Sequence, residues 1–291
     1  MQRVASVAEA RSALSGPRLA GRTIGLVPTM GVLHQGHLSL VRASEERCDL
    51  TVASVFVNPT QFGPGEDLES YPRDLDRDAA LLEAEGVDVL FCPSEQEMYP
   101  PGSESRVDPG PIATVLCGAS RPGHFIGVAT VVVKLLGIVA PSAAFFGEKD
   151  YQQLKVVERV VRDLDLPVEV FGCPIVRDGA GLALSSRNRY LDAGERAHAL
   201  VLSRALLRVR EQVCGGRTDA AALVASLTDE ISAEPGVRLD YAAVVDADTL
   251  APVEMVTRPC RALVAAQVGA ARLIDNVAVG PAPDGPGSAG R

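Results

Sequence analysis

The sequence has 291 residues, of which 47% are hydrophobic and 22% are charged, enough for one large or two ordinary folded domains. The net charge of −9 and the pI near 5.0 argue against a broad nucleic-acid-binding surface, which needs clustered Lys and Arg. The chain start lacks the apolar core of a signal peptide, and no apolar run reaches membrane-spanning length, so we expect a cytoplasmic protein. Six scattered cysteines without C-x-x-C spacing predict reduced, buried residues rather than a zinc or redox site.

Strand and helix patterns alternate through the first half of the chain. We expect strands at residues 23–27, 50–57, 87–92, 143–146 and 168–171, and helices at residues 37–47, 75–85, 126–139 and 151–163. The segment 126–139 is rich in β-branched residues, and its length favours a buried helix. This rhythm predicts an α/β fold with a parallel sheet covered by helices on both faces. Ligands of such sheets bind beyond the carboxyl ends of the strands, where the turns at 28–37, 58–62 and 147–150 fall.

The pattern changes after residue 176. Long Ala/Leu/Arg-rich helical stretches are expected at residues 192–213 and 219–233, followed by strands at 239–245, 261–268 and 271–277. Helices followed by a small meander predict a second, smaller α+β domain. The expected organisation is an α/β domain at 1–176, a C-terminal α+β domain at 177–280 and a disordered Pro/Gly-rich tail at 281–291.

Two of the four histidines lie in His34-Gln35-Gly36-His37, directly after an expected strand. A strand that feeds a glycine-bearing turn and then a helix places backbone N–H groups and both imidazoles where phosphates of a nucleotide bind. Gly36 lets a nucleotide approach the backbone closely. The alternative interpretation is a pair of surface or helix-capping histidines, because short motifs have many false positives.

Two further segments carry groups suited to phosphate. Gly147-Glu148-Lys149-Asp150 follows an apolar strand and precedes a helix, and Lys149 there would balance phosphate charge; the alternative is an ordinary helix start at which Asp150 complements the helix dipole. Leu184-Ser185-Ser186-Arg187 offers hydroxyls and a permanently charged guanidinium, or else forms a solvated turn.

Uncharged side chains near these turns suit a polar organic acid. Gln61 and Gln153 both donate and accept hydrogen bonds, so they would hold hydroxyls and a carboxylate without neutralising a nucleophile. On sequence alone, such residues are more often simply exposed. Asn58 is a weaker candidate in the same turn as Gln61. Arg121 and His124 lie either near a site entrance or in a helix-start turn.

Five blocks in order resemble the pantothenate synthetase family: PTMGVLHQGH, FVNPTQF, RPGHFIGV, FFGEKDYQQ and LSSRN. The resemblance covers nearly the whole chain apart from the tail. It implies a Rossmann-like member of the HIGH-motif nucleotidyl-transfer superfamily that is a cytoplasmic homodimer. The implied reaction condenses pantoate with β-alanine at the expense of ATP, through pantoyl adenylate, with release of AMP and pyrophosphate. The second domain is then a lid that covers the nucleotide.

The resemblance also implies roles for single residues. His37, as proton donor, His34 and Lys149 are implied to be catalytic. Gln61 and Gln153 are implied to bind pantoate, and Gln61 also β-alanine. The implied ATP contacts are Met30, Gly31, Val32, Leu33, His34, Gln35, Gly36, His37, Gly147, Glu148, Lys149, Asp150, Val176, Leu184, Ser185, Ser186 and Arg187.

Magnesium is the expected cofactor, because it neutralises the triphosphate and binds largely through substrate phosphates. Some relatives carry adjacent acidic residues in the helix after the YPR sequence, where this chain has Asp76-Arg77-Asp78. Because Arg77 interrupts the pair, the metal ligands stay unassigned.

Other functions remain open. A simple nucleotidylyltransferase would share the HxGH turn yet keep AMP in its product, and a non-catalytic nucleotide-binding protein would keep the fold without needing both histidines beside Lys149 and Arg187. A tRNA synthetase is disfavoured by the small second domain and the acidic charge. Pyrophosphate release separates the non-catalytic alternative from the enzymes.

Overall fold

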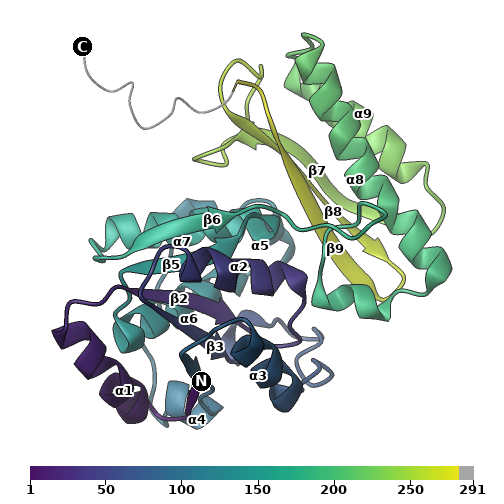
Figure 1. Ribbon diagram of the computed structural model, residues 1–291. Coiled ribbons are helices and arrows are strands. Elements are labelled where there is room, and N and C mark those ends of the chain that lie inside the picture. Colours follow the sequence, from purple (N-terminus) through teal and green to yellow (C-terminus); the bar gives the residue numbers. More distant parts are fainter. Residues whose placement is uncertain (282–291) are drawn as a thin grey trace, which may run out of the picture. The chain divides into compact units, whose positions relative to one another are not determined.

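The computed structural model describes residues 1–281 (Figure 1). Its contacts divide the chain between Val176 and Arg177 into two compact units, each with its own sheet. The tail predicted at 281–291 lies outside the described residues except for Pro281. Among residues 1–281, no helix is both long and apolar enough to cross a membrane.

The first unit is built on a six-stranded sheet in which every pair of neighbours is parallel. In spatial order the strands are β1 (Gln2–Val4), β4 (Val89–Phe91), β3 (Leu50–Val55), β2 (Ile24–Thr29), β5 (Ala143–Gly147) and β6 (Glu169–Cys173). Because β2 lies between β3 and β5, the turns that follow these three strands meet at one edge of the sheet.

Helices flank this sheet (Figure 1). They are α1 (Val7–Leu19), α2 (Gln35–Glu45), α3 (Leu75–Ala84), α4 (Glu95–Met98), α5 (Cys117–Ser120), α6 (His124–Val139) and α7 (Tyr151–Asp163), with 3-10 turns at Pro59–Gln61, Gly110–Ala113 and Glu148–Asp150. Val27, Val41, Leu82 and Phe145 are among the buried residues of a core that joins α2 and α3 to the sheet. The predicted α/β class with a parallel sheet is confirmed.

The second unit contains an antiparallel sheet of three consecutive strands, β7 (Val237–Asp246), β8 (Cys260–Val268) and β9 (Ala271–Val279). Helices α8 (Ala193–Cys214) and α9 (Ala220–Ser232) pack against it, and a 3-10 turn spans Ser186–Tyr190. Leu206, Leu223 and Val264, all fully buried, belong to the core between helices and strands. The predicted α+β architecture of the smaller C-terminal part is confirmed.

Several details differ from the predictions. Helix α2 begins at Gln35 instead of residue 37, and helix α1 with strand β1 was not predicted. Gly16 and Pro17 lie in the last turn of α1 and mask its helical pattern. The prediction of buried cysteines is right for Cys117, Cys173 and Cys260, holds in part for the half-buried Cys48 and Cys92, and is wrong for Cys214, which is exposed at the end of α8. All six cysteines are free thiols.

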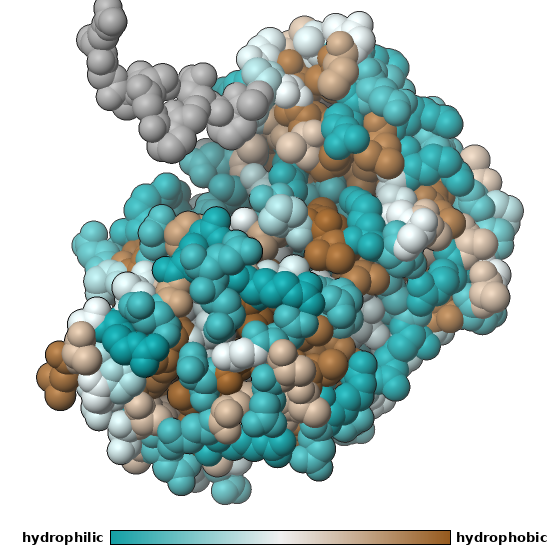
Figure 2. Space-filling view, in the orientation of Figure 1, coloured by the Kyte–Doolittle hydropathy of each residue, from teal (hydrophilic) through white to brown (hydrophobic). Residues whose placement is uncertain are grey.

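Hydrophilic and apolar residues are interspersed over the face of the molecule drawn in Figure 2. Among the large apolar side chains at the surface, Leu19 is 90% exposed and Leu164 is 50% exposed, and both lie at helix ends. Scattered surface apolar residues of this kind are ordinary for a globular chain.

Candidate active site

The HxGH motif forms the start of helix α2. His34 is the N-cap and His37 the third helical residue, and the two close a reciprocal capping arrangement. The His34 N–H donates to Nδ1 of His37 at 3.3 Å, and the Gly36 N–H donates to Nδ1 of His34 at 3.1 Å. The ring centroids lie 4.1 Å apart. The three-residue spacing therefore places both imidazoles side by side at the helix N-terminus.

These bonds also fix the tautomers of the two rings. Because each Nδ1 accepts an amide hydrogen, a neutral ring carries its own hydrogen on Nε2. Within residues 1–281, neither Nε2–H is donated to another protein group. The site thus holds two adjacent N–H donors available to a ligand.

Desolvation of these two half-buried rings keeps both of them neutral. It is the main cause that lowers the pKa of His34 to about 4, assisted by the charge of Lys149 and opposed by that of Asp150. Burial likewise lowers the pKa of His37 to about 3, with further effects from His34 and Lys149. At neutral pH, both imidazoles are therefore hydrogen-bond donors rather than cations in the free protein.

Strand β5 delivers Lys149 to the same edge of the sheet. Gly147 ends the strand, and residues Glu148–Asp150 form one 3-10 turn before α7. Lys149 Nζ lies 3.8 Å from a carboxylate oxygen of Asp150, and the charge of Lys149 acts on both histidines. Asp150 is the N-cap of α7 by position, but its side chain makes no capping hydrogen bond. The structure thus brings the GEKD segment and the HxGH turn together.

The turn after β3 holds Gln61 in a defined orientation. Asn58, which is 1% exposed, donates through Nδ2 to Oε1 of Gln61 at 3.0 Å and to the Gly127 carbonyl at 3.1 Å. Oδ1 of Asn58 accepts from the Tyr99 hydroxyl and the Thr60 hydroxyl, each at 2.9 Å. All polar atoms of the Asn58 side chain are therefore engaged in positioning.

Gln61 consequently presents its amide nitrogen rather than its oxygen. Nε2 of Gln61 lies 3.1 Å from the sulfur of Met30, so the turns after β2 and β3 touch. Helix α6 approaches this turn closely, since a Cβ on Gly127 would lie 2.2 Å from the carbonyl oxygen of Thr60. Only glycine allows that approach.

Arg121 and His124 hold the main chain of Gln61. Arg121 donates through Nη2 to the Gln61 carbonyl at 3.2 Å and pairs with both oxygens of Glu66 at 2.7 and 2.6 Å. Its Nη1 lies 3.0 Å from Nε2 of His124, which must accept, so Nδ1 of His124 donates to the Gln61 carbonyl at 2.8 Å. Burial is the main cause that lowers the pKa of His124 to about 4, and the positive charge of Arg121 is the second. The neutral tautomer agrees with this lowered pKa.

Gln153 is the third residue of α7 and is partly exposed, and its side chain makes no hydrogen bond to any described residue. Its neighbour Gln152 is 4% exposed and binds the main chain of the preceding segment through Ile112, Val115 and Cys117. Of the two adjacent glutamines, Gln152 is thus structural, and Gln153 is the one with free hydrogen-bonding groups.

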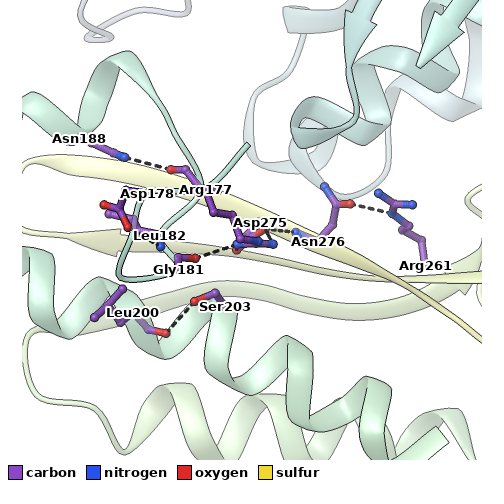
Figure 3. A network of polar contacts seen from close by, with 11 residues as sticks. Arg177, Asp178, Gly181, Leu182, Asn188, Leu200, Ser203, Arg261, Asp275 and Asn276 are labelled. Atoms are coloured by element: carbon purple, nitrogen blue, oxygen red, sulfur yellow. Dashed lines mark hydrogen bonds and ion pairs between the residues drawn. The ribbon is translucent and has the colours of Figure 1, made fainter. Parts of the chain in front are cut away.

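The second unit carries the LSSR segment directly after a hairpin-like turn at residues 177–183, and Figure 3 shows the polar contacts of Arg177, Asn188 and Asp275. Arg177 donates to both oxygens of Asp275 on β9 at 2.6 and 2.9 Å and to the Gly181 carbonyl at 3.1 Å. Ser185 accepts the Arg187 amide, and Asn188 donates to the Ala183 carbonyl at 2.9 Å. Residues 177–188 are thus fastened to the sheet of the second unit. Val176 is the last residue of the first unit.

The acidic residues after the YPR sequence do not form a metal site. Asp78 is 1% exposed, and its two oxygens accept the amides of Val32 and Leu33, whereas the side chain of Asp76 is 96% exposed and pairs with Arg3. Within the part of the chain that the structure describes, no three His, Cys, Asp or Glu side chains gather in a way that could hold a metal ion. Asp76 and Asp78 therefore do not gather as adjacent ligands for a metal ion.

The sequence predictions missed the residues that support the site: Asp78, which holds the turn before the histidines, Tyr99, Glu66, and the pair of Arg177 with Asp275. Each acts on a partner 41 to 98 residues away, for example Tyr99 on Asn58 and Arg177 on Asp275. A local pattern carries no signal for such contacts.

Comparison with known proteins assigns this chain to a family. A family profile described as pantoate-beta-alanine ligase matches residues 2–278. Pantothenate synthetases of Acidobacterium capsulatum and Heliobacterium modesticaldum are 53% and 56% identical, covering 97% and 89% of this chain and 98% and 92% of theirs.

Solved structures agree with these matches. The crystal structure of pantothenate synthetase from Thermus thermophilus superposes with a TM-score of 0.92 at 52% identity, over 97% of this chain and all (100%) of that one. Pantoate-beta-alanine ligase from Francisella tularensis, complexed with beta-gamma ATP and beta-alanine, gives 0.80 at 36% identity over 95% and 97% of the two chains. The chain belongs to the pantoate–β-alanine ligase family.

Proposed function

We propose that the chain joins pantoate to β-alanine through a pantoyl-adenylate intermediate. In the first step, a carboxylate oxygen of pantoate bonds to the α-phosphorus of ATP while the bond to pyrophosphate breaks. In the second, the amine of β-alanine bonds to the acyl carbon, the bond to AMP breaks, and the amine proton passes to solvent. Activation is needed because a carboxylate is a poor acylating agent.

The observation that carries this proposal is the pair of neutral Nε2–H donors of His34 and His37 beside Lys149. Negative charge accumulates on the phosphate chain in the first step, and preorganised donors and a cation stabilise it. A bound triphosphate would raise the pKa of both rings, because an opposite charge favours the protonated form. The assignment of His37 as proton donor stays a prediction.

Gln61 and Gln153 are assigned to pantoate. Asn58 occupies Oε1 of Gln61, so Nε2 of Gln61 is the group that donates to a carboxylate or hydroxyl of the acid. An uncharged donor binds the carboxylate without neutralising it as nucleophile. The amine of β-alanine is assigned to the Gln61 side of the site; the Francisella tularensis relative complexed with beta-alanine supports binding of this substrate class.

The nucleotide is assigned to residues Met30–His37, Gly147–Asp150, Val176 and Leu184–Arg187. The first domain, residues 1–176, thus supplies catalysis, and the second, residues 177–280, covers the nucleotide as a lid. Magnesium enters with ATP and is held by phosphate oxygens, because this ion binds largely through substrate phosphates. A homodimer in the cytoplasm is the expected state, which light scattering of the purified protein and cell fractionation would check.

Product analysis by mass spectrometry tests the proposal. The protein is incubated with ATP, Mg²⁺, pantoate and β-alanine, and each acid or amine is omitted in turn. We expect pantothenate and AMP only when both are present, and pantoate-dependent exchange of pyrophosphate into ATP without β-alanine. Pantothenate formed with ADP instead of AMP would contradict the adenylate; bound ATP without any product would favour a non-catalytic protein.

A further inference from the structure

The turn that leads into the two histidines is held by a side chain from another helix. Asp78, in the first turn of α3, is 1% exposed. Its Oδ2 accepts the Val32 amide at 2.7 Å, and its Oδ1 accepts the Leu33 amide at 2.8 Å. Charge-assisted bonds of this length to two successive amides are among the stronger hydrogen bonds in proteins.

The conformation that Asp78 holds is an unfavourable one. Val32 has φ +53°, in the left-handed region, and is β-branched, so this backbone shape is strained. Gly31 before it has φ +84°, and its amide donates to the Thr29 hydroxyl at 3.3 Å. Without the two bonds from Asp78, Val32 would relax toward negative φ.

Relaxation at Val32 would displace the histidines. Leu33, which is 1% exposed, directly precedes His34, and His34 caps α2 while its amide bonds to His37. We propose that Asp78 is a positioning residue that holds the strained turn Gly31–Leu33 and thereby sets the placement of His34 and His37 for ATP. This inference rests on the proposed role of the two histidines.

Asp78 acts through the main chain rather than through its charge. The charges that shift the pKa of His34 are those of Lys149 and Asp150, and those acting on His37 come from His34 and Lys149. Each oxygen of Asp78 already accepts one amide, and Arg77 Nη1 lies 3.8 Å from Oδ1, so a metal ligand role would require the clamp to share its carboxylate. A clamp and a metal ligand predict different phenotypes.

The test compares Asp78→Asn with Asp88→Asn. Asparagine keeps the shape of Asp78 but turns one acceptor into a donor facing an amide. Asp88→Asn is the control for loss of a carboxylate that accepts an amide, since the exposed Asp88 accepts the Thr51 amide at 2.9 Å in the same unit, away from the motif. Three properties are measured: pantoate-dependent ATP–pyrophosphate exchange, its Mg²⁺ dependence, and ¹⁵N shifts of the imidazoles, of which the chain has only four.

We expect Asp78→Asn to lower kcat/KM for ATP about 10- to 100-fold, with the Mg²⁺ half-saturation unchanged and the Nδ1 shifts of two histidines moved. Asp88→Asn leaves all three properties unchanged. Val32→Gly in the Asp78→Asn background restores part of the rate, because glycine adopts positive φ without strain.

If the Asp78→Asn protein does not fold, the Gly31→Ala variant is tested instead. A Cβ at residue 31 would lie 2.9 Å from Oδ2 of Asp78 and would displace the carboxylate from the two amides. The same kinetic and NMR signature is then expected. A wild-type rate in the folded variant, or a loss that excess Mg²⁺ restores, would overturn the inference. Absence of exchange in the wild-type protein would instead contradict the proposed function.

Discussion

The turn at residues 30–37 and the segment at residues 177–188 are both fastened by a buried aspartate, but by different contacts. In the first unit, Asp78 binds main-chain amides directly. In the second, Asp275 binds the side chain of Arg177, which in turn reaches the Gly181 carbonyl. The first clamp fixes the backbone next to the histidines, whereas the second acts through a side chain at the first residue of its unit.

The difference indicates how each segment is expected to respond when its contacts are removed by substitution. A main-chain clamp with 1% exposed Asp78 leaves little freedom, so placement of His34 and His37 is expected to be nearly rigid. Arg177 is 24% exposed, and its pair with Asp275 is accessible to solvent from one side. Segment 177–188 is therefore expected to unfold locally more easily than the turn at residues 30–37.

The largest effect is expected at the histidines themselves. His37→Ala removes one Nε2–H donor and the acceptor of the His34 amide, so adenylate formation should slow about 100-fold or more. Pre-steady-state quench of ATP consumption measures it. His198→Ala, at a histidine paired with Glu234 in the second unit, is the control and should keep the wild-type rate. An unchanged rate in His37→Ala would remove that residue from the mechanism.

A smaller effect is expected from the second clamp. Asp275→Ala leaves Arg177 without its carboxylate partner, so the second unit should lose about 1–3 kcal/mol of unfolding free energy and the KM for ATP should rise about tenfold. Chemical denaturation and steady-state kinetics give the two values. Arg204→Gln, which removes the pairs that a half-exposed arginine makes with Glu230 and Glu234 in the same unit, should change neither by much. A stability loss with an unchanged KM would separate this segment from the nucleotide.

The positioning of Gln61 extends the comparison to a third turn. Tyr99→Phe removes the hydroxyl that donates to Asn58, so the Gln61 amide is held less firmly and the KM for pantoate should rise about fivefold. The KM for ATP serves as the internal control and should stay the same. An equal change in both constants would mean that the substitution disturbs the site as a whole.

The last comparison concerns acid sensitivity, which we expect to differ between the two units. His34, His37 and His124, whose pKa values are lowered to about 4, 3 and 4, all lie in the first unit. A histidine that is neutral in the fold and protonated when unfolded takes up protons on unfolding, so its stabilising contribution, full above about pH 6.5, falls as pH drops.

Hydrogen exchange followed between pH 7 and pH 5 should therefore show opening of the first unit becoming easier, after correction for the intrinsic exchange rate. His124→Gln should reduce that slope. Equal slopes before and after the substitution would show that the burial of His124 does not govern acid sensitivity.

Much of the fold follows from local pattern. Helix α7, at Tyr151–Asp163, has the bounds that its spacing predicts, and the three strands of the second unit were found within a few residues of their ends. Helix α1 was missed because Gly16 and Pro17 look like a break, although both fall in its final turn. The start of α2 was misplaced because its N-cap is a histidine instead of Ser, Thr, Asp or Asn.

In the candidate site, too, some residues could be predicted from local sequence and others could not. The residues His34, His37, Lys149 and Gln61 stand in recognisable blocks, and the structure brings them to one edge of the sheet. What holds them could not be predicted: the left-handed Val32 and the contact of Asp78 with it depend on packing between residues 46 positions apart. Nor does a sequence show that burial, more than charge, keeps the histidines neutral.

The most direct test of the adenylate route is transfer of ¹⁸O from the carboxylate of labelled pantoate. The protein is incubated with this acid, unlabelled ATP, Mg²⁺ and β-alanine, and the nucleotide product is examined by mass spectrometry. Because a carboxylate oxygen bonds to the α-phosphorus and stays there when the amine displaces AMP, we expect one ¹⁸O in each AMP. Unlabelled AMP, or label in inorganic phosphate with ADP as product, would contradict it.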